Sequence, residues 1–261
     1  MSEMDGIQLK EIWRGNAPSY GAWVTGTDPA IAAAVCNAGY EWLFVDGEHC
    51  PYSLETLRTV VAAIRARNVV PIVRVAANDA AMIKQVLDVG AEGVVVPLLM
   101  TADDARRAVG ACRYPPLGTR GFNPRDASNY YQDLDYYRST IDERVVVVVQ
   151  VEHRDAVENL DGILSVAGID GVLIGPADLS YSLGFPLQPR CPTVEEAIVT
   201  TIKKCNAARV PVGITVMGGT QDFVYWLGHG LNFITLGFDF DWVTRAGKNA
   251  LTEMRVATGG R

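Results

Sequence analysis

Short apolar segments that alternate with helical segments constrain the fold of this chain more than any other feature. Eight strand-then-helix units follow one another along the 261 residues. Such alternation indicates a parallel sheet, and eight units in a chain of this length favour a single (β/α)8 barrel, or TIM barrel, over a doubly wound sheet. No break in composition marks a boundary, so residues 1–261 are expected to form one domain. The predicted strands are 20–24, 42–45, 70–75, 93–96, 145–151, 172–174, 210–216 and 232–236.

The segments between the predicted strands carry the start and stop signals of helices. Ser53 and Thr101 stand where N-caps are expected, and Gly39 and Gly90 stand where helices should end. The predicted helices are a short one at about 7–14, then 28–38, 53–67, 79–89, 101–112, 130–140, 154–165, 194–209, 220–227 and 241–255. The connection 113–129 is rich in Pro, Gly and Arg and is longer than usual, which indicates a working loop.

Composition and charge exclude several classes of function. Although 49% of the residues are hydrophobic, no apolar run reaches the roughly 18 residues that a membrane span needs, and the first residues do not read as a secretory signal. The net charge of −7 argues against a nucleic-acid or anionic-membrane partner. Five cysteines are scattered without a CxxC pair, which is typical of reduced thiols in a cytoplasmic protein.

The stretch 171–183, GVLIGPADLSYSL, reads as a buried strand, a tight Gly-Pro turn and a helix that starts near Asp178. The free N–H groups at a helix N-terminus bind anions. Asp178 either caps this helix or holds a metal. In a parallel barrel the active site lies at the carboxyl ends of the strands, where Glu152 also stands. The two carboxylates suit a hard divalent ion such as Mg²⁺ or Mn²⁺, or they are merely a strand-end carboxylate beside a helix cap.

Two further side chains at these strand ends can take part in chemistry. Arg74 occupies an inward position near the end of its strand, and a buried arginine needs a partner. It either pairs with Glu48, Asp46 or Glu152, or faces an anionic or enolising substrate; both can hold at once. His49 follows another strand end, where a general base could stand, although a lone loop histidine is more often only exposed.

Together these motifs resemble the HpcH/HpaI class II aldolases, which cleave 4-hydroxy-2-oxo acids. The combination of DGEH, YPPxGxRG and IGPxDLSxSLG is specific, although no piece is specific alone. The matching segments are FVDGEHCPYS (44–53), PIVRV (71–75), LDVGAEGVVVP (87–97), RYPPLGTRG (113–121), VQVE (149–152) and GIDGVLIGPADLSYSLG (168–184). The resemblance implies a (β/α)8 barrel and a homo-oligomer, a hexamer or trimer, whose subunits can exchange the last helix.

The resemblance also implies roles for particular residues. A divalent metal, Mg²⁺ or Mn²⁺ and also Co²⁺, would bind Glu152 and Asp178 and chelate pyruvate. The pyruvate carboxylate would meet the N–H groups of Ala177 and Asp178 in the turn after Gly175, with Gln150 beside the metal. The remaining implied roles fall to Arg74 as the group that stabilises the enolate, His49 as acid/base, Asp88 as the orienting partner of His49, and Arg120 as a contact for the distal end of the substrate.

Asp88 should lie at the rim opposite the active site, because it ends a helix that precedes a strand. Its contact with His49 is therefore expected to come from a neighbouring subunit. No lysine stands among the implied site residues, which argues against a Schiff-base aldolase.

We therefore expect a metal-dependent aldolase that cleaves or forms 4-hydroxy-2-oxo acids through a pyruvate enolate, with an aldehyde as the other partner. One alternative is an oxaloacetate decarboxylase or related enolate-forming lyase. Another, of a different class, is a non-catalytic barrel that binds 2-oxo acids. The segment after Gly121 departs from the sugar-acid members of the family, so the aldehyde stays open.

Overall fold

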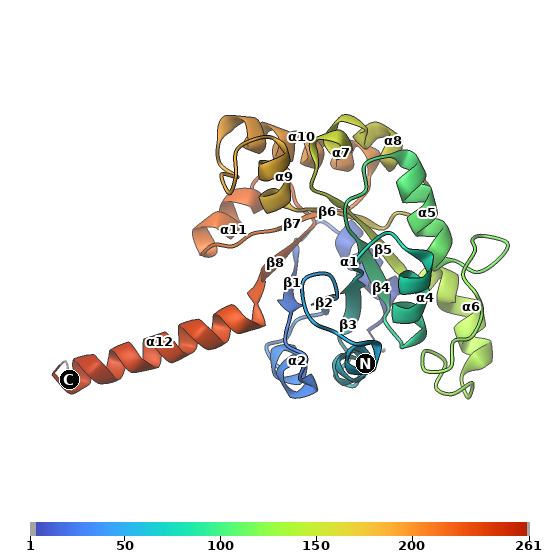
Figure 1. Ribbon diagram of the computed structural model, residues 1–261, viewed down its shortest axis with the longest axis horizontal. Coiled ribbons are helices and arrows are strands. Elements are labelled where there is room, and N and C mark those ends of the chain that lie inside the picture. The colour runs from blue at the N-terminus through green and yellow to red at the C-terminus, as the bar shows by residue number, and fades with distance from the viewer. Residues whose placement is uncertain (1–3, 260–261) are drawn as a thin grey trace.

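The computed structural model describes residues 4–259 and contains a closed barrel of parallel strands (Figure 1). Each strand pairs with the next along the chain, and the last pairs with the first. The predicted (β/α)8 barrel is thus confirmed. The strands are β1 (Ser19–Val24), β2 (Trp42–Asp46), β3 (Val70–Arg74), β4 (Gly93–Val96), β5 (Val146–Val151), β6 (Gly171–Ile174), β7 (Val212–Thr215) and β8 (Phe233–Phe238).

Helices follow the strands largely as the capping signals predicted. The side chains of Ser53 and Thr101 accept hydrogen bonds from backbone N–H groups in the first turns of their helices, as N-caps do. Among the residues described, no helix is both long enough and apolar enough to traverse a bilayer. The helices are α1 (Gly6–Arg14), α2 (Pro29–Cys36), α3 (Leu54–Arg65), α4 (Ala80–Asp88), α5 (Ala102–Cys112), α6 (Leu134–Arg144), α7 (Arg154–Glu158), α8 (Leu160–Leu164), α9 (Pro176–Ser182), α10 (Pro192–Ala208), α11 (Thr220–Leu227) and α12 (Asp239–Ala257).

Several predicted helix boundaries differ from the observed ones by a few residues, and three of the differences have a local cause. The helix expected over 130–140 begins only at Leu134, because residues 129–131 take left-handed φ values of 51°, 53° and 66°. The helix expected over 154–165 is divided into α7 and α8 at Asn159, whose side chain donates a hydrogen bond to the Met100 carbonyl at 3.0 Å. The helix expected near Asp178 already begins at Pro176, where proline has a suitable φ and lacks an N–H to satisfy.

Aromatic side chains close the amino-terminal end of the barrel. Trp13 of α1 stacks on Phe233 with the ring centroids 4.1 Å apart and meets Trp42 edge-on. Two glycines make room for these rings: a Cβ on Gly21 would lie 2.4 Å from the Trp42 ring, and one on Gly213 would lie 2.2 Å from Phe233. Because this end is filled, the carboxyl ends of the strands are left for a binding site.

The last helix does not cover its own barrel. Figure 1 shows α12 extending away from the barrel, so that most of this helix does not pack against the strands of its own chain. Tyr20, which points outward from β1, is 44% exposed. Large apolar side chains also lie exposed along α12, namely Phe240, Val243, Leu251, Met254 and Val256.

Candidate active site

A cavity of about 680 Å³ opens at the carboxyl ends of the barrel strands. Six of the residues expected at the site line it, namely His49, Arg74, Gln150, Gly175, Ala177 and Asp178. They come from β3, β5, the loop after β2 and the start of α9. The parallel barrel brings them together because all its strands end at the same rim.

Arg74 is held rigidly at the inner end of this cavity. It pairs in register with Asp46 on the neighbouring strand, and its Nε and Nη2 donate hydrogen bonds to the two carboxylate oxygens at 3.0 and 2.8 Å. Its Nη1 lies 3.2 Å from Glu48 Oε2, and its guanidinium carbon lies 4.5 Å from the centre of the Trp23 ring. The residue is only 8% exposed yet lines the cavity, so it both pairs with carboxylates and can face a ligand.

Burial and charge act in opposite directions on the carboxylates around Arg74. Burial alone would raise the pKa of Asp46, but the hydrogen bonds and charge of Arg74 outweigh it and leave that pKa lowered. For Glu48 burial prevails over the attraction of Arg74 and His49, and its pKa is raised. Asp46 therefore remains the ionised partner that fixes the guanidinium.

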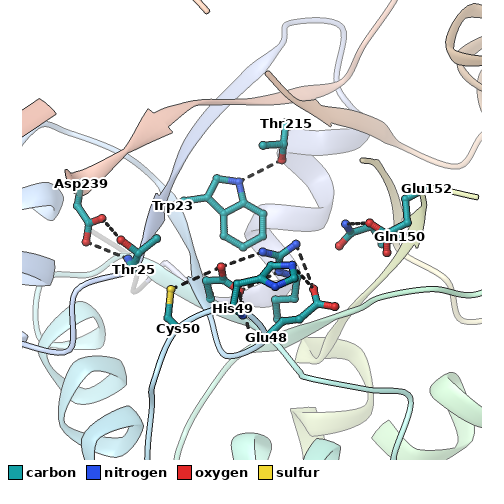
Figure 2. Close-up of polar contacts among 11 residues, drawn as sticks. Trp23, Thr25, Glu48, His49, Cys50, Gln150, Glu152, Thr215 and Asp239 are labelled. Carbon is teal, nitrogen blue, oxygen red and sulfur yellow. Dashed lines mark hydrogen bonds and ion pairs between the residues drawn. The ribbon is translucent and has the colours of Figure 1, made fainter. Parts of the chain in front are cut away.

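His49 lies in the loop after β2 with its side chain 64% exposed (Figure 2). Its Nε2 is 3.4 Å from Glu48 Oε2. Asp46 accepts a hydrogen bond from the backbone N–H of His49, at 3.3 Å. Glu48 is thus the carboxylate beside the imidazole in this chain, a role that the sequence analysis missed although the DGEH motif contains it.

Gln150 on β5 and Glu152 just after the end of this strand lie two residues apart and point the same way (Figure 2). The Gln150 amide donates a hydrogen bond to Glu152 Oε2, and the backbone N–H of Leu98 donates one to Glu152 Oε1 at 2.9 Å. Burial raises the pKa of Glu152 to about 7, against the Leu98 hydrogen bond, and the negative charges of Asp178 and Glu48 add to the rise. The charge of Arg74 opposes this rise but does not offset it, so Glu152 is a buried carboxyl whose pKa stays raised.

Gly175 allows α9 to begin directly against these side chains. A Cβ at this position would lie 2.7 Å from Glu152 Oε2 and 3.0 Å from Gln150 Nε2, closer than side-chain contacts permit. With φ at −100° the backbone would tolerate another residue, so close approach and not conformation requires glycine here. The first turn of α9 presents the N–H groups of Ala177 and Asp178, which have no partner within the helix.

The donors at this end of the cavity fit a hard divalent cation. The described residues contain no group of three His, Cys, Asp or Glu side chains placed to hold a metal. They do offer the Glu152 and Asp178 carboxylates, and beside them the buried Gln150 Oε1, which has no hydrogen-bond partner. Oxygen ligands of this kind, completed by water and substrate, suit Mg²⁺ or Mn²⁺.

Asp88 and Arg120 do not line the cavity of their own chain. Asp88 ends α4, at the rim opposite the cavity, and its carboxylate accepts a hydrogen bond from Arg120 Nη2 at 2.6 Å. Arg120 is buried, with its guanidinium carbon 4.7 Å from the centre of the Tyr114 ring. Arg120 Nε and Nη1 are buried without a hydrogen-bond partner, and the expected contact of Arg120 with the distal end of the substrate stays a prediction.

Sequence reasoning also overlooked the contact that ties β8 to β1. Asp239 Oδ2, at the start of α12, accepts a hydrogen bond from the backbone N–H of Thr25 at 2.9 Å (Figure 2). It accepts a second from the backbone N–H of Gly26 at 2.8 Å. Trp23 Nε1 donates to Thr215 Oγ1 at 3.1 Å across the cavity wall. Trp23 could have been found, since it occupies an inward position near the end of a strand.

The family model for HpcH/HpaI aldolase/citrate lyase matches residues 19–246. The chain belongs to this family. That match spans every barrel strand and every site residue described above.

Named relatives of this HpcH/HpaI member include curated aldolases. A 2-keto-3-deoxy-L-rhamnonate aldolase of Salmonella dublin is 39% identical over 241 residues, which are 91% of this chain and 89% of the relative. An HpcH/HpaI aldolase/citrate lyase family protein of Burkholderia cenocepacia J2315 is 35% identical, with a TM-score of 0.89 over 95% of this chain and 99% of the other. A citrate synthase, 29% identical, has a TM-score of 0.85 over 96% and 98% of the two chains. This member is accordingly an aldolase, which makes it a carbon–carbon lyase.

Proposed function

We propose that this aldolase cleaves a 4-hydroxy-2-oxo acid into pyruvate and an aldehyde and also catalyses the reverse reaction. Both directions pass through a pyruvate enolate as the intermediate. The main support is that Arg74, Gln150 and the start of α9 line one end of one cavity, with the buried Glu152 directly behind them against Gln150 and Gly175. This arrangement places a cation, oxygen ligands and free N–H groups around a space where negative charge can develop. Preorganised groups of this kind are the largest source of catalysis in many enzymes.

Glu152 and Asp178 would hold the metal, Mg²⁺ or Mn²⁺ with Co²⁺ as a further candidate. When bound, the metal supplies a Lewis acid that favours negative charge on the oxygens of the 2-oxo acid. The raised pKa of Glu152 supports the assignment, because a cation would stabilise the ionised form that burial disfavours.

The remaining groups at the inner end bind and orient the 2-oxo acid. The N–H groups of Ala177 and Asp178 receive its carboxylate. Arg74, fixed by Asp46, directs its guanidinium at the oxygen that becomes negative as the enolate forms. Gln150 orients Glu152 through their hydrogen bond.

His49 acts as the general base in the cleavage direction. It removes the proton of the 4-hydroxyl group, the C3–C4 bond breaks, and the electron pair of that bond forms the enolate as the aldehyde leaves. Protonation of the enolate at C3 then gives pyruvate. Asp88 would orient His49 of a neighbouring subunit, because it lies away from the cavity of its own chain.

A homo-oligomer would complete this arrangement. The exposed apolar side chains of α12, and the exposure of Tyr20 on the outer face of β1, support an assembly, a hexamer or trimer, in which subunits exchange the last helix. Exposure of apolar side chains to water is unfavourable in free energy, and large exposed apolar patches usually mark interaction surfaces.

Exchange of the methyl protons of pyruvate tests the enolate step apart from any aldehyde. The purified protein is incubated with pyruvate in D₂O, with Mg²⁺, with Mn²⁺ and with EDTA, and followed by proton NMR. We expect exchange that requires the metal and is lost in the Glu152→Ala variant. Absence of exchange with every metal would refute the proposal. Faster turnover of oxaloacetate than of hydroxy-oxo acids would instead identify a decarboxylase.

A further inference from the structure

The cavity is divided into a polar part and an apolar part by the strands that contribute to it. Its charged and amide groups come from β2, β3, β5 and the start of α9. The other part is formed by the ends of β7 and β8 and the loop between α9 and α10. We call this part the outer wall, and its side chains are Leu187, Pro189, Val216, Met217, Phe238 and Phe240. With a volume of about 680 Å³, the cavity falls in the usual range of ~300–1,000 Å³ for whole ligands, far more than pyruvate fills.

The outer wall offers little to a hydroxylated ligand. None of its side chains is charged or polar. Arg190 directly follows Pro189 in the sequence but does not line the cavity. Its guanidinium carbon lies 3.3 Å from the centre of the Tyr225 ring, and its Nε lies 3.4 Å from Glu195 Oε2. Of the two threonine hydroxyls that line the cavity, that of Thr25 donates to Asp239 and that of Thr215 accepts from Trp23 Nε1, which leaves the O–H of Thr215 as a single donor for a ligand.

The aromatic part of the outer wall is fixed in place. Asp239 accepts a hydrogen bond from the Phe240 N–H at 2.9 Å while it binds the loop after β1. Phe238 stacks on Trp23 with centroids 6.2 Å apart and contacts Phe240 at 5.4 Å. A continuous aromatic surface therefore leads outward from the ring that covers Arg74.

We propose that the outer wall selects an aldehyde whose body is apolar, a hydrocarbon or aromatic group, over one that carries hydroxyl groups. This inference rests on the proposed aldolase function, because the aldehyde must occupy the cavity beyond the pyruvate carbons. Each methylene buried against such a wall gains about a fourfold preference, whereas a hydroxyl buried without a partner is penalised.

Matched aldehydes test the proposal in the direction of aldol formation. Propanal and glycolaldehyde differ by a methyl in place of a hydroxyl, and butanal and pentanal extend the hydrocarbon series. Initial rates with saturating pyruvate and Mn²⁺ give kcat/KM, normalised to the unhydrated aldehyde. We expect propanal to exceed glycolaldehyde by at least about tenfold, and each added methylene to raise kcat/KM about fourfold.

A substitution on the outer wall tests whether this surface causes the preference for apolar over hydroxylated aldehydes. Met217 is 81% exposed, so Met217→Ser should fold, and it should lower the ratio of pentanal to glycolaldehyde by about four- to fifteenfold. Val224→Ser is the matched control, since Val224 lies on α11, is 62% exposed and does not line the cavity; it should leave the ratio unchanged.

Two results would overturn the inference. If the enzyme exchanges pyruvate protons but uses glycolaldehyde as well as or better than propanal, the apolar selection is refuted and the aldolase function stands. If it exchanges no protons with any metal, the proposed function and this inference fail together.

Discussion

Replacing Gly175 by alanine tests whether close approach at this residue sets the geometry of the site. The new Cβ would meet Glu152 Oε2 at 2.7 Å, Glu152 Cβ at 2.9 Å and Gln150 Nε2 at 3.0 Å. Both neighbours are buried, so either Glu152 or the start of α9 must move. Overpacking of this kind costs about 1–3 kcal/mol, which for a chain of this size lowers Tm by roughly 2–12 °C. A displacement near 1 Å at a catalytic group costs on the order of 100-fold in rate.

Two assays and one control separate these effects. We expect Gly175→Ala to bind Mn²⁺ more weakly by calorimetry and to exchange pyruvate protons about 100-fold more slowly at a temperature where it remains folded. Gly110→Ala is the control, because a Cβ on Gly110, within α5, meets nothing within 4 Å. It should be neutral or stabilising by up to about 1 kcal/mol. Wild-type metal binding and exchange in Gly175→Ala would refute the argument that glycine is required by contact with Glu152.

Three more predictions concern the charged groups. In the Asp46→Asn variant Arg74 loses its bidentate carboxylate partner. This variant should exchange pyruvate protons much more slowly, and urea unfolding should show a loss of stability of about 3–5 kcal/mol. An unchanged exchange rate would contradict this. The pKa of Glu152, raised to about 7, predicts that metal affinity falls about tenfold per pH unit below that value. It also predicts that the metal-free protein loses stability as pH rises from about 4.5 to 7, since only the folded state retains the proton there; Glu152→Gln should abolish this slope in thermal melts. Lys10→Met should destabilise the protein by about 3–5 kcal/mol, because Lys10 pairs with Asp170 at 3.0 Å and donates hydrogen bonds to two backbone carbonyls. The same variant should leave the rate of proton exchange per folded molecule unaltered, since Lys10 lies at the opposite end of the barrel.

The barrel and the inner end of the site could be predicted because both depend on local pattern. Apolar segments of strand length recur with helices between them, and parallel strands must end at one rim. The sequence therefore places Arg74, Glu152 and Asp178 at a common rim of the barrel. Their partners were not all predictable: the nearness of Glu48 to His49 depends on the turn of the loop after β2.

Features that depend on irregular backbone or on distant contacts escaped prediction. Arg120 belongs to a long loop whose path no periodicity determines, and its pairing with Asp88 follows from tertiary packing. The left-handed residues before Leu134 and the break between two helices at Asn159 likewise interrupt segments whose local sequence pattern is helical. Local periodicity therefore does not predict these interruptions. The direction of α12 also escaped prediction, because an amphipathic sequence predicts a helix with an apolar face but not the surface against which that face packs.

In the homo-oligomer proposed above, the outward course of α12 would tie folding of this protein to its concentration. A lone subunit leaves Tyr20 on β1 and the apolar residues of α12 in water, so burial of these groups awaits an encounter with a second chain. Folding after dilution from denaturant should then include a second-order phase, and Tm should rise with protein concentration. Before assembly, these exposed apolar side chains would be open to unspecific association. Recovery of native protein should consequently pass through a maximum, limited by assembly in dilute solution and by aggregation in concentrated solution.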